Sequence, residues 1–273
     1  MAYATVMVHV DFDAATQARV RLAADLADRF EATLVGIAAR TPHPPSVRGG
    51  LAIPPLLTQE SLDELKVALD RHEHRFRSLA AKEGRRLEWR SALDFPTEFV
   101  VREARAADLV IIGRGRLLDD PYQSLDPGAL LLRVGRPVLV VPNGLDRLHA
   151  NRVAVAWKDT RKARRVLFDS LPFLRGAEKV FVVEVYEGHD AGAAQLRVTD
   201  VANYLSRHRI TATAALAVQA GNVTDELLRA IRTEQIDLLV VGAYGHSRLG
   251  EWVFGGVTRD LLARSPICCF FSH

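Results

Sequence analysis

The residues best suited to chemistry are glycines in the second half of the chain. Gly242-Ala243-Tyr244-Gly245 follows an apolar run, and Gly255-Gly256-Val257-Thr258 opens a later segment with helical spacing. Glycine lets a backbone approach an anion closely, and a helix N-terminus offers unpaired N–H groups. The pattern predicts a phosphate-binding loop; glycines that serve only tight turns are the alternative. Thr258 either adds a hydroxyl to such a site or serves in the first turn of the helix.

Other candidates stand at the end of the first strand-like run of that half and just after it. They are Ala156, Trp157, Lys158 and Asp159. The Trp157 indole could stack on a purine and Lys158 could meet a phosphate; packing and a solvated charge are the respective alternatives. Val185, at the end of the next run, is a candidate ribose contact. His246 falls inside the glycine loop, but no nucleophile–base pair with an orienting third group can be assigned around it.

Short apolar runs alternate with helix-period segments along the whole chain, which is typical of a parallel α/β sheet. Strands are expected at 5–10, 33–39, 86–92, 108–113, 137–141, 152–157, 180–185, 210–218, 237–241 and 267–271. Helices are expected between them at 14–30, 57–82, 97–106, 130–134, 161–173, 193–208, 225–233 and 257–264. His9, inside the first strand, favours a core role.

The second half repeats the first. Residues 107–113 (ADLVIIG) match 236–242 (IDLLVVG), and residues 136–141 (RPVLVV) match 265–270 (SPICCF), in the same order and followed by the same elements. Such coincidence indicates tandem copies of one fold. The polar segment 143–151 separates them, so we expect domains at 1–147 and 148–273.

The first copy keeps an acidic strand end at Asp11 but lacks the glycine spacing after Gly113. Asp126 would repel a phosphate, and Pro127 removes a donor where a cradle needs one. We interpret this copy as degenerate, with no phosphate near residues 113–128, although Asp11 could hold a ribose or a small neutral ligand. The proline-rich stretch 41–56 has no counterpart and predicts an extended loop, either a cap or contact surface or a plain surface excursion.

Composition narrows the class of protein. The 273 residues include 36 Lys and Arg against 33 Asp and Glu, a net charge of +3, which gives no reason to propose nucleic acid as a partner. The two cysteines are adjacent and unsuited to a disulfide scaffold. There is no recognisable leader and no apolar stretch near the roughly 20 residues of a membrane span. We expect a soluble, cytoplasmic protein.

Gly242, Gly245 and Gly255, spaced as Gly-x-x-Gly, nine residues, Gly, resemble the nucleotide-binding signature of the universal stress protein family. The whole chain resembles the tandem form of that family. The resemblance implies an α/β fold of two doubly wound, five-stranded parallel sheets with order 3-2-1-4-5, related by a pseudo-twofold axis. The terminal runs 137–141 and 266–271 would then pair within the chain. Gly256 stands where the family more often has serine, and Trp157 where nucleotide-binding members have aspartate.

The resemblance implies a stress-response protein that binds ATP or ADP, with or without Mg²⁺, in its second domain and acts by binding or signalling with a protein partner. The predicted contacts form one set, Ala156, Trp157, Lys158, Asp159, Val185, Gly242, Gly245, His246, Gly255, Gly256, Val257 and Thr258. Two alternatives remain open: a protein-interaction module that binds no nucleotide, and a slow ATP hydrolase. The pseudo-dimer could also form a further homodimer.

Overall fold

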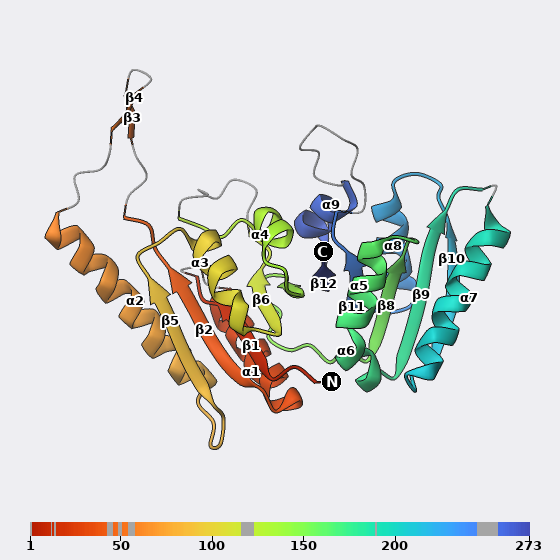
Figure 1. Cartoon of the computed structure of the whole chain (residues 1–273), viewed down its shortest axis with the longest axis horizontal. Helices are drawn as coiled ribbons and strands as arrows, with labels where there is room; N and C mark the ends of the chain where they lie inside the picture. The colour runs from red at the N-terminus through yellow and green to blue at the C-terminus, as the bar shows by residue number, and fades with distance from the viewer. Residues whose placement is uncertain are drawn as a thin grey trace. The chain divides into compact units, whose positions relative to one another are not determined.

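The structure is a computed structural model that describes residues 2–11, 13, 15–42, 46–48, 51–53, 58–115, 123–188, 190–244 and 256–273. It confirms the predicted α/β class, with helices packed against sheets of mainly parallel strands (Figure 1). The chain is divided into two compact units. The first unit comprises Tyr3–Arg136 and Asn143–Arg147, and the second comprises Pro137–Pro142 and Leu148–His273.

The first unit contains a parallel sheet in the order β5-β2-β1-β6. Its elements are β1 (Thr5–His9), α1 (Thr16–Phe30), β2 (Thr33–Ala39), β3 (Ser46–Arg48), β4 (Leu51–Ile53), α2 (Gln59–Ala80), β5 (Leu87–Ala92), α3 (Pro96–Glu103), the 3₁₀ helix η1 (Ala104–Ala106), β6 (Leu109–Gly113) and α4 (Pro127–Arg133).

Part of the proline-rich stretch differs from the expected extended loop. β3 and β4 pair as an antiparallel hairpin, with Arg48 opposite Leu51. Proline therefore does not keep the whole stretch from pairing, because the hairpin strands themselves contain none.

The second unit contains five parallel strands in the order β10-β9-β8-β11-β12, which is 3-2-1-4-5 in chain order. Its elements are β7 (Val138–Val141), β8 (Arg152–Trp157), α5 (Arg161–Asp169), α6 (Leu171–Gly176), β9 (Lys179–Tyr186), α7 (Ala191–Arg207), β10 (Ala212–Val218), α8 (Val223–Thr233), β11 (Leu238–Gly242), α9 (Gly256–Arg264) and β12 (Cys268–Ser272). The predicted helix over 161–173 is two helices, because Pro172 in the first turn of α6 cannot continue α5.

β7 completes the second unit from outside its own sequence repeat. It pairs antiparallel with β12, with Val140 opposite Cys269 and Val138 opposite Phe271. All four β7 residues and all five β12 residues are buried. The predicted pairing of the two terminal strands is therefore confirmed, and it covers an apolar edge that would otherwise present free backbone groups.

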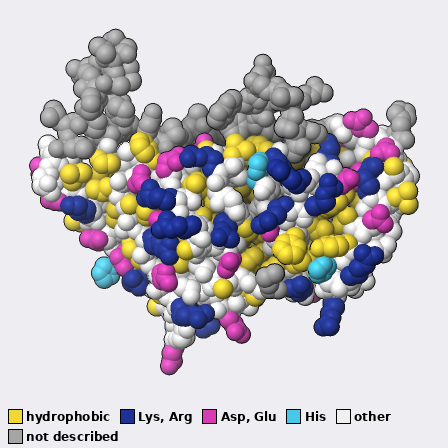
Figure 2. All heavy atoms as spheres, viewed as in Figure 1, with side chains coloured by type: hydrophobic (Ala, Val, Ile, Leu, Met, Phe, Trp, Pro, Cys, Tyr) yellow, Lys and Arg dark blue, Asp and Glu magenta, His cyan; other side chains and the backbone are white. Residues whose placement is uncertain are grey.

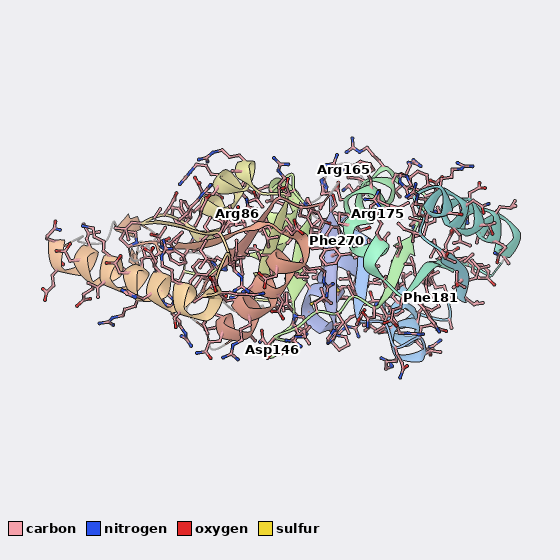
Figure 3. All side chains as sticks on the ribbon, turned by 90° about the horizontal axis from the view of Figure 1, so that it is seen from below. Arg86, Asp146, Arg165, Arg175, Phe181 and Phe270 are labelled. Carbon is pink, nitrogen blue, oxygen red and sulfur yellow. The ribbon has the colours of Figure 1, made fainter. Side chains whose placement is uncertain are left out.

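Helices cover both faces of the second unit's sheet. α5 and α7 contact β11, β12, β9 and β10, whereas α8 and α9 contact each other and lie on the opposite face, as right-handed crossovers require (Figure 3). Phe270 of β12 is fully buried and packs edge-on against Phe173 of α6, with ring centroids 5.7 Å apart. This core fixes the strand ends from which the candidate site is built.

Candidate functional site

The end of β8 lies in a row of residues that crosses the second unit's sheet. Trp157 is in register with Glu184 of β9, Ala156 with Val241 of β11, and Gly242 with Ser272 of β12. Trp157 and Gly242 are therefore neighbours at the carboxyl ends of the first and fourth strands. This is the topological switch point, where ligands bind in open α/β sheets.

Gly242 is needed for packing as well as for any ligand. A Cβ on Gly242 would stand 3.0 Å from the carbonyl carbon of Lys162 and 3.1 Å from the amide nitrogen of Ala163. The first turn of α5 is thus seated against the end of β11. Thr160 caps that turn by accepting a hydrogen bond from the Ala163 N–H at 3.2 Å.

Lys162, which the sequence analysis did not select, lies at the start of the glycine loop. Its ammonium donates to the carbonyl oxygen of Tyr244, and Nζ lies 2.6 Å from Nε2 of His273. Burial, followed by the nearby charge of Arg161, lowers the pKa of Lys162. The selected Lys158 is exposed instead. The two lysines differ in their distance from the glycine loop. That distance could not be known from the sequence, because it depends on the register of β8, β11 and β12.

Thr258 ties α9 to the same point. Its Oγ1 accepts the backbone N–H of Tyr244 at 3.1 Å, and only 3% of the residue is exposed. Tyr244 itself has a φ of 56°, in the left-handed region. The first turns of α5 and α9 therefore both attach to Tyr244, one through Lys162 and one through Thr258. Gly256 is exposed and Val257 half-buried at the start of α9.

Trp157 carries an unsatisfied donor. It is 8% exposed, and its Nε1 is buried with no hydrogen-bond partner among the residues described. A buried N–H without an acceptor costs about 1–3 kcal/mol. Its in-register neighbour Glu184 is satisfied, since Arg197 of α7 donates to its carboxylate at 2.6 and 3.0 Å. The missing hydrogen bond is therefore confined to Trp157 and is not shared by its neighbour Glu184.

The structure does not bring all of the predicted residues together. Ala156 and Val185 alternate with Trp157 and Glu184 along their strands, so their side chains face the other side of the sheet. Asp159 is exposed and pairs with Arg164 at 2.5 Å. Gly245, His246 and Gly255 lie outside the described residues.

The corresponding strand ends of the first unit are filled by an arginine. Arg19 of α1 is 2% exposed and pairs with Asp11 at 2.6 Å. Burial by itself would raise the pKa of Asp11, but the charge of Arg19 and then that of His9 hold it well below its usual range. Burial lowers the pKa of His9 to about 4, partly opposed by Asp11. The Asp11 carboxylate is thus already engaged by the protein.

Asp126 occupies the other predicted position in the first unit. Its Oδ1 accepts the N–H groups of Gly128 and Ala129, at 2.8 and 3.2 Å, and Pro127 stands in the first turn of α4. The free donors of this helix start are therefore met by a carboxylate of the chain itself.

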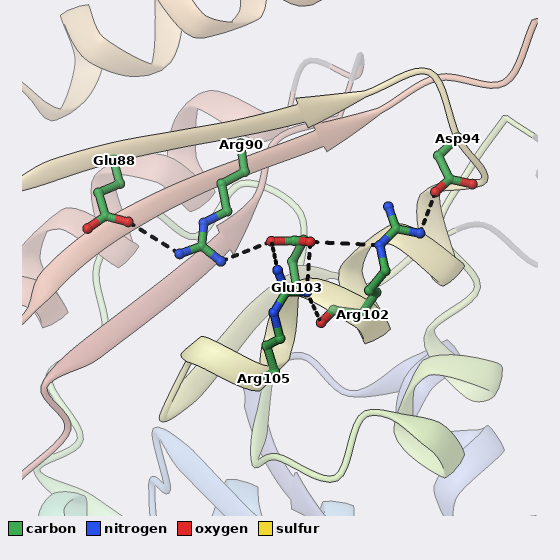
Figure 4. Close-up of polar contacts among 6 residues, drawn as sticks. All are labelled: Glu88, Arg90, Asp94, Arg102, Glu103 and Arg105. Carbon is green, nitrogen blue, oxygen red and sulfur yellow. Dashed lines mark hydrogen bonds and ion pairs between the residues drawn. The ribbon is translucent and has the colours of Figure 1, made fainter.

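Arginines elsewhere in the first unit take part in ion pairs. The carboxylate of Glu103, with 12% of its side chain exposed, accepts from Arg90 at 3.0 Å and from Arg105 at 2.9 Å, while Arg102 pairs with Asp94 at 2.8 Å (Figure 4). On the face shown in Figure 2, basic side chains lie among acidic and neutral ones.

A separate apolar groove of about 380 Å³ lies between α8 and the strands β9 and β10. Phe181, Val183 and Ala217 line it, with Glu226 and Arg229 from the helix (Phe181 is labelled in Figure 3). No predicted site residue lines this groove. It is on the face opposite to Trp157 and Glu184, because Phe181 and Val183 alternate with Glu184 along β9.

No group of three or more His, Cys, Asp or Glu is placed to hold a metal ion within the described ranges. In the same part of the chain, none of the helices combines the length and apolar character that crossing a membrane requires.

Comparison with known proteins gives a family for the second half. Residues 152–269 match the model of the universal stress protein family. A search of proteins with curated functions gives no match. The matched residues run from β8 to β12 and so include the switch point described above.

Solved structures extend the likeness to the whole chain. A universal stress protein from Archaeoglobus fulgidus DSM 4304 superposes with a TM-score of 0.75 at 13% identity, over 98% of this chain and 95% of its own. A candidate universal stress protein from Pseudomonas aeruginosa UCBPP-PA14 gives 0.61 at 12% identity, over 99% and 93%. A functionally unknown protein from Pseudomonas aeruginosa PAO1 gives 0.57 at 13% identity, over 99% and 92%.

At such identities the likeness to solved structures shows a shared fold, and the family model supplies the family. Residues 152–269 of the second half therefore match the universal stress protein family, and the whole chain shares the fold of solved universal stress proteins.

Proposed function

We propose that the second unit binds one adenine nucleotide, ATP or ADP, at the carboxyl ends of β8 and β11, with or without Mg²⁺. The protein would act in the stress response by binding and signalling rather than by fast catalysis. Two features of the site support nucleotide binding over a purely structural role: a cation beside the glycine loop, and an unsatisfied donor at the neighbouring strand end.

The observation that carries the proposal is the buried indole N–H of Trp157. Trp157 follows Ala156, which is in register with Val241 at the switch point, and its N–H has no acceptor within the described part of the chain. A nucleotide offers ring nitrogens and hydroxyl oxygens that can accept this hydrogen bond, and a purine can also stack on an indole. Nucleotide binding would thus remove the free-energy cost of leaving this buried N–H without an acceptor.

The phosphate end of the ligand is assigned to Lys162 and the first turn of α9. The ammonium of Lys162 lies at the carbonyl of Tyr244, two residues after Gly242, and Thr258 holds α9 to the same residue. A charge-assisted hydrogen bond from an ammonium to a phosphate, together with the free N–H groups of a helix start, favours an anion here.

The first unit is not expected to take a nucleotide. Asp11 is paired with Arg19, and Asp126 covers the start of α4. We therefore expect at most one nucleotide per chain, contacted by residues around 156–159, 242–246 and 255–258.

Native mass spectrometry of the full chain, as purified and after addition of ATP or ADP, tests this directly. One bound nucleotide per chain is the expected result, and calorimetry should give the same stoichiometry. No bound nucleotide at millimolar concentrations, or two per chain, would contradict the proposal. Binding without measurable release of phosphate over hours would separate a binding protein from a slow hydrolase.

A further inference from the structure

Arg19 is the one fully buried cation among the described residues that stands at a switch point. It is the fourth residue of α1 and lies at the carboxyl ends of β1 and β6. Its Nε donates to the carbonyl oxygen of His9 at 2.9 Å, and its Nη2 donates to Thr16 Oγ1 at 2.9 Å and pairs with Asp11 at 2.6 Å. A buried guanidinium is stable only when it is matched in this way.

Further hydrogen bonds hold the Asp11 carboxylate, which binds this guanidinium, in place. The Thr16 hydroxyl donates to the Asp11 carboxylate, and Asp13 contributes a backbone N–H to the same carboxylate at 3.3 Å. A carboxylate, a hydroxyl and a backbone carbonyl therefore converge on one planar cation, the arrangement that a guanidinium fork prefers.

Gly113 completes the receptor by leaving room. A Cβ at Gly113 would lie 2.2 Å from Nη1 of Arg19 and 3.1 Å from its central carbon. The glycine does not have a positive φ, so backbone conformation does not require it. The space that it leaves at the end of β6 is occupied by the guanidinium.

The second unit shows that the fold does not need this cation. Val6 is in register with Leu109 in the first unit, as Val153 is with Leu238 in the second, so Val6 and Val153 are equivalent positions. Counting onward from them by the same number of residues makes Val166 the counterpart of Arg19 and Lys158 that of Asp11. The arginine and its carboxylate are thus replaced together, and Val166 is fully buried. There the backbone of α5 itself reaches Gly242.

We propose that the first unit contains a guanidinium-binding site, formed by Asp11, Thr16, the carbonyl of His9 and the space beside Gly113, and that Arg19 of the same chain is its ligand. The bound guanidinium closes the switch point of this unit to other ligands. A receptor of this chemistry takes a planar cation and discriminates against an ammonium, which lacks the fork, and against phosphate, which Asp11 repels. This inference does not depend on nucleotide binding by the second unit.

Removing the side chain and supplying its head group separately tests the site. In the full chain, Arg19→Ala leaves the receptor empty, so methylguanidinium at low millimolar concentration should raise the midpoint of thermal unfolding by about 2–4 °C. Wild type, whose site is filled, should show no rise, and methylammonium should stabilise neither protein. Val166→Ala is the matched control, because it removes a buried side chain at the equivalent point without creating a cation receptor.

The outcomes are distinct. A rise confined to Arg19→Ala and to methylguanidinium supports the proposal. An equal response of wild type, Arg19→Ala and Val166→Ala, or an equal effect of the two cations on Arg19→Ala, overturns it. If Arg19→Ala does not fold alone, refolding it with each cation asks the same question: recovery only with methylguanidinium supports the site, and equal failure with both overturns it.

Discussion

Gly242 lies against the backbone of Lys162, so that a Cβ on Gly242 would stand only 3.0 Å from the carbonyl carbon of Lys162. One glycine thus joins two parts of the candidate site: it ends β11, and it allows the first turn of α5 to present Lys162 beside Tyr244. The glycine pattern reflects helix–strand packing at this position as well as access for an anion.

Gly242→Ala should therefore destabilise the protein by about 1–3 kcal/mol, because the added methyl group meets backbone atoms that cannot rotate away. Chemical denaturation of the full chain measures the change. Gly256→Ala is the control, since a Cβ there meets no atom of the described residues within 4 Å, and it should leave the unfolding free energy unchanged or slightly raised. Equal effects of the two substitutions would refute the packing argument.

Lys162→Met should weaken nucleotide binding by about 10- to 100-fold, the usual value of a charge-assisted hydrogen bond. Methionine keeps the aliphatic stem, so the packing beside Gly242 is retained. The exposed Lys158 provides the comparison: Lys158→Met should change affinity by less than about 3-fold. Calorimetry with ADP distinguishes them, and a larger loss from Lys158→Met would reassign the phosphate contact to the residue chosen from sequence.

Trp157→Phe tests the buried indole N–H. Phenylalanine retains an aromatic ring but cannot donate, so nucleotide affinity should fall by about 2- to 12-fold. Trp89→Phe, in β5 of the first unit, is the matched substitution at a distant tryptophan and should leave affinity unchanged. An unchanged affinity for Trp157→Phe would show that the N–H stays unpaired in the complex.

The strands of the second unit could be predicted because apolar runs and their repetition mark them directly, whereas their order was implied by the family resemblance. Lys162 could not be identified in that way, because Tyr244 and His273, which it contacts, are distant in the chain. Arg19 contacts residues close in sequence, but the space that admits its side chain is left by Gly113, far along the chain. Helical periodicity treats both as ordinary polar residues. Comparison of the two repeats gave one indication, since the residue equivalent to Arg19 in the second copy is the apolar Val166.

Lowering the pH should destabilise the first unit through His9. The folded protein keeps His9 neutral down to a pH of about 4, whereas the unfolded chain protonates it near 6.5. Between those values the unfolded state binds more protons, so stability rises with pH, by at most about 3 kcal/mol. His9→Gln should flatten this slope in denaturation measured from pH 4 to 7. The exposed His74→Gln is the control, and identical slopes for wild type and His9→Gln would contradict the assignment.

The pairing of β7 with β12 predicts a difference between two fragments. Val140 lies opposite Cys269, and Leu139 opposite Phe270, so residues 148–273 alone would expose the apolar edge of β12. Such an edge recruits another strand, and this fragment should self-associate at micromolar concentrations. Residues 137–273 keep β12 covered by β7 and should self-associate less strongly at the same concentration. Sedimentation velocity compares the two, with circular dichroism to establish that each is folded. A folded, monomeric 148–273 fragment would show that β12 needs no partner strand, and that the role of β7 lies elsewhere.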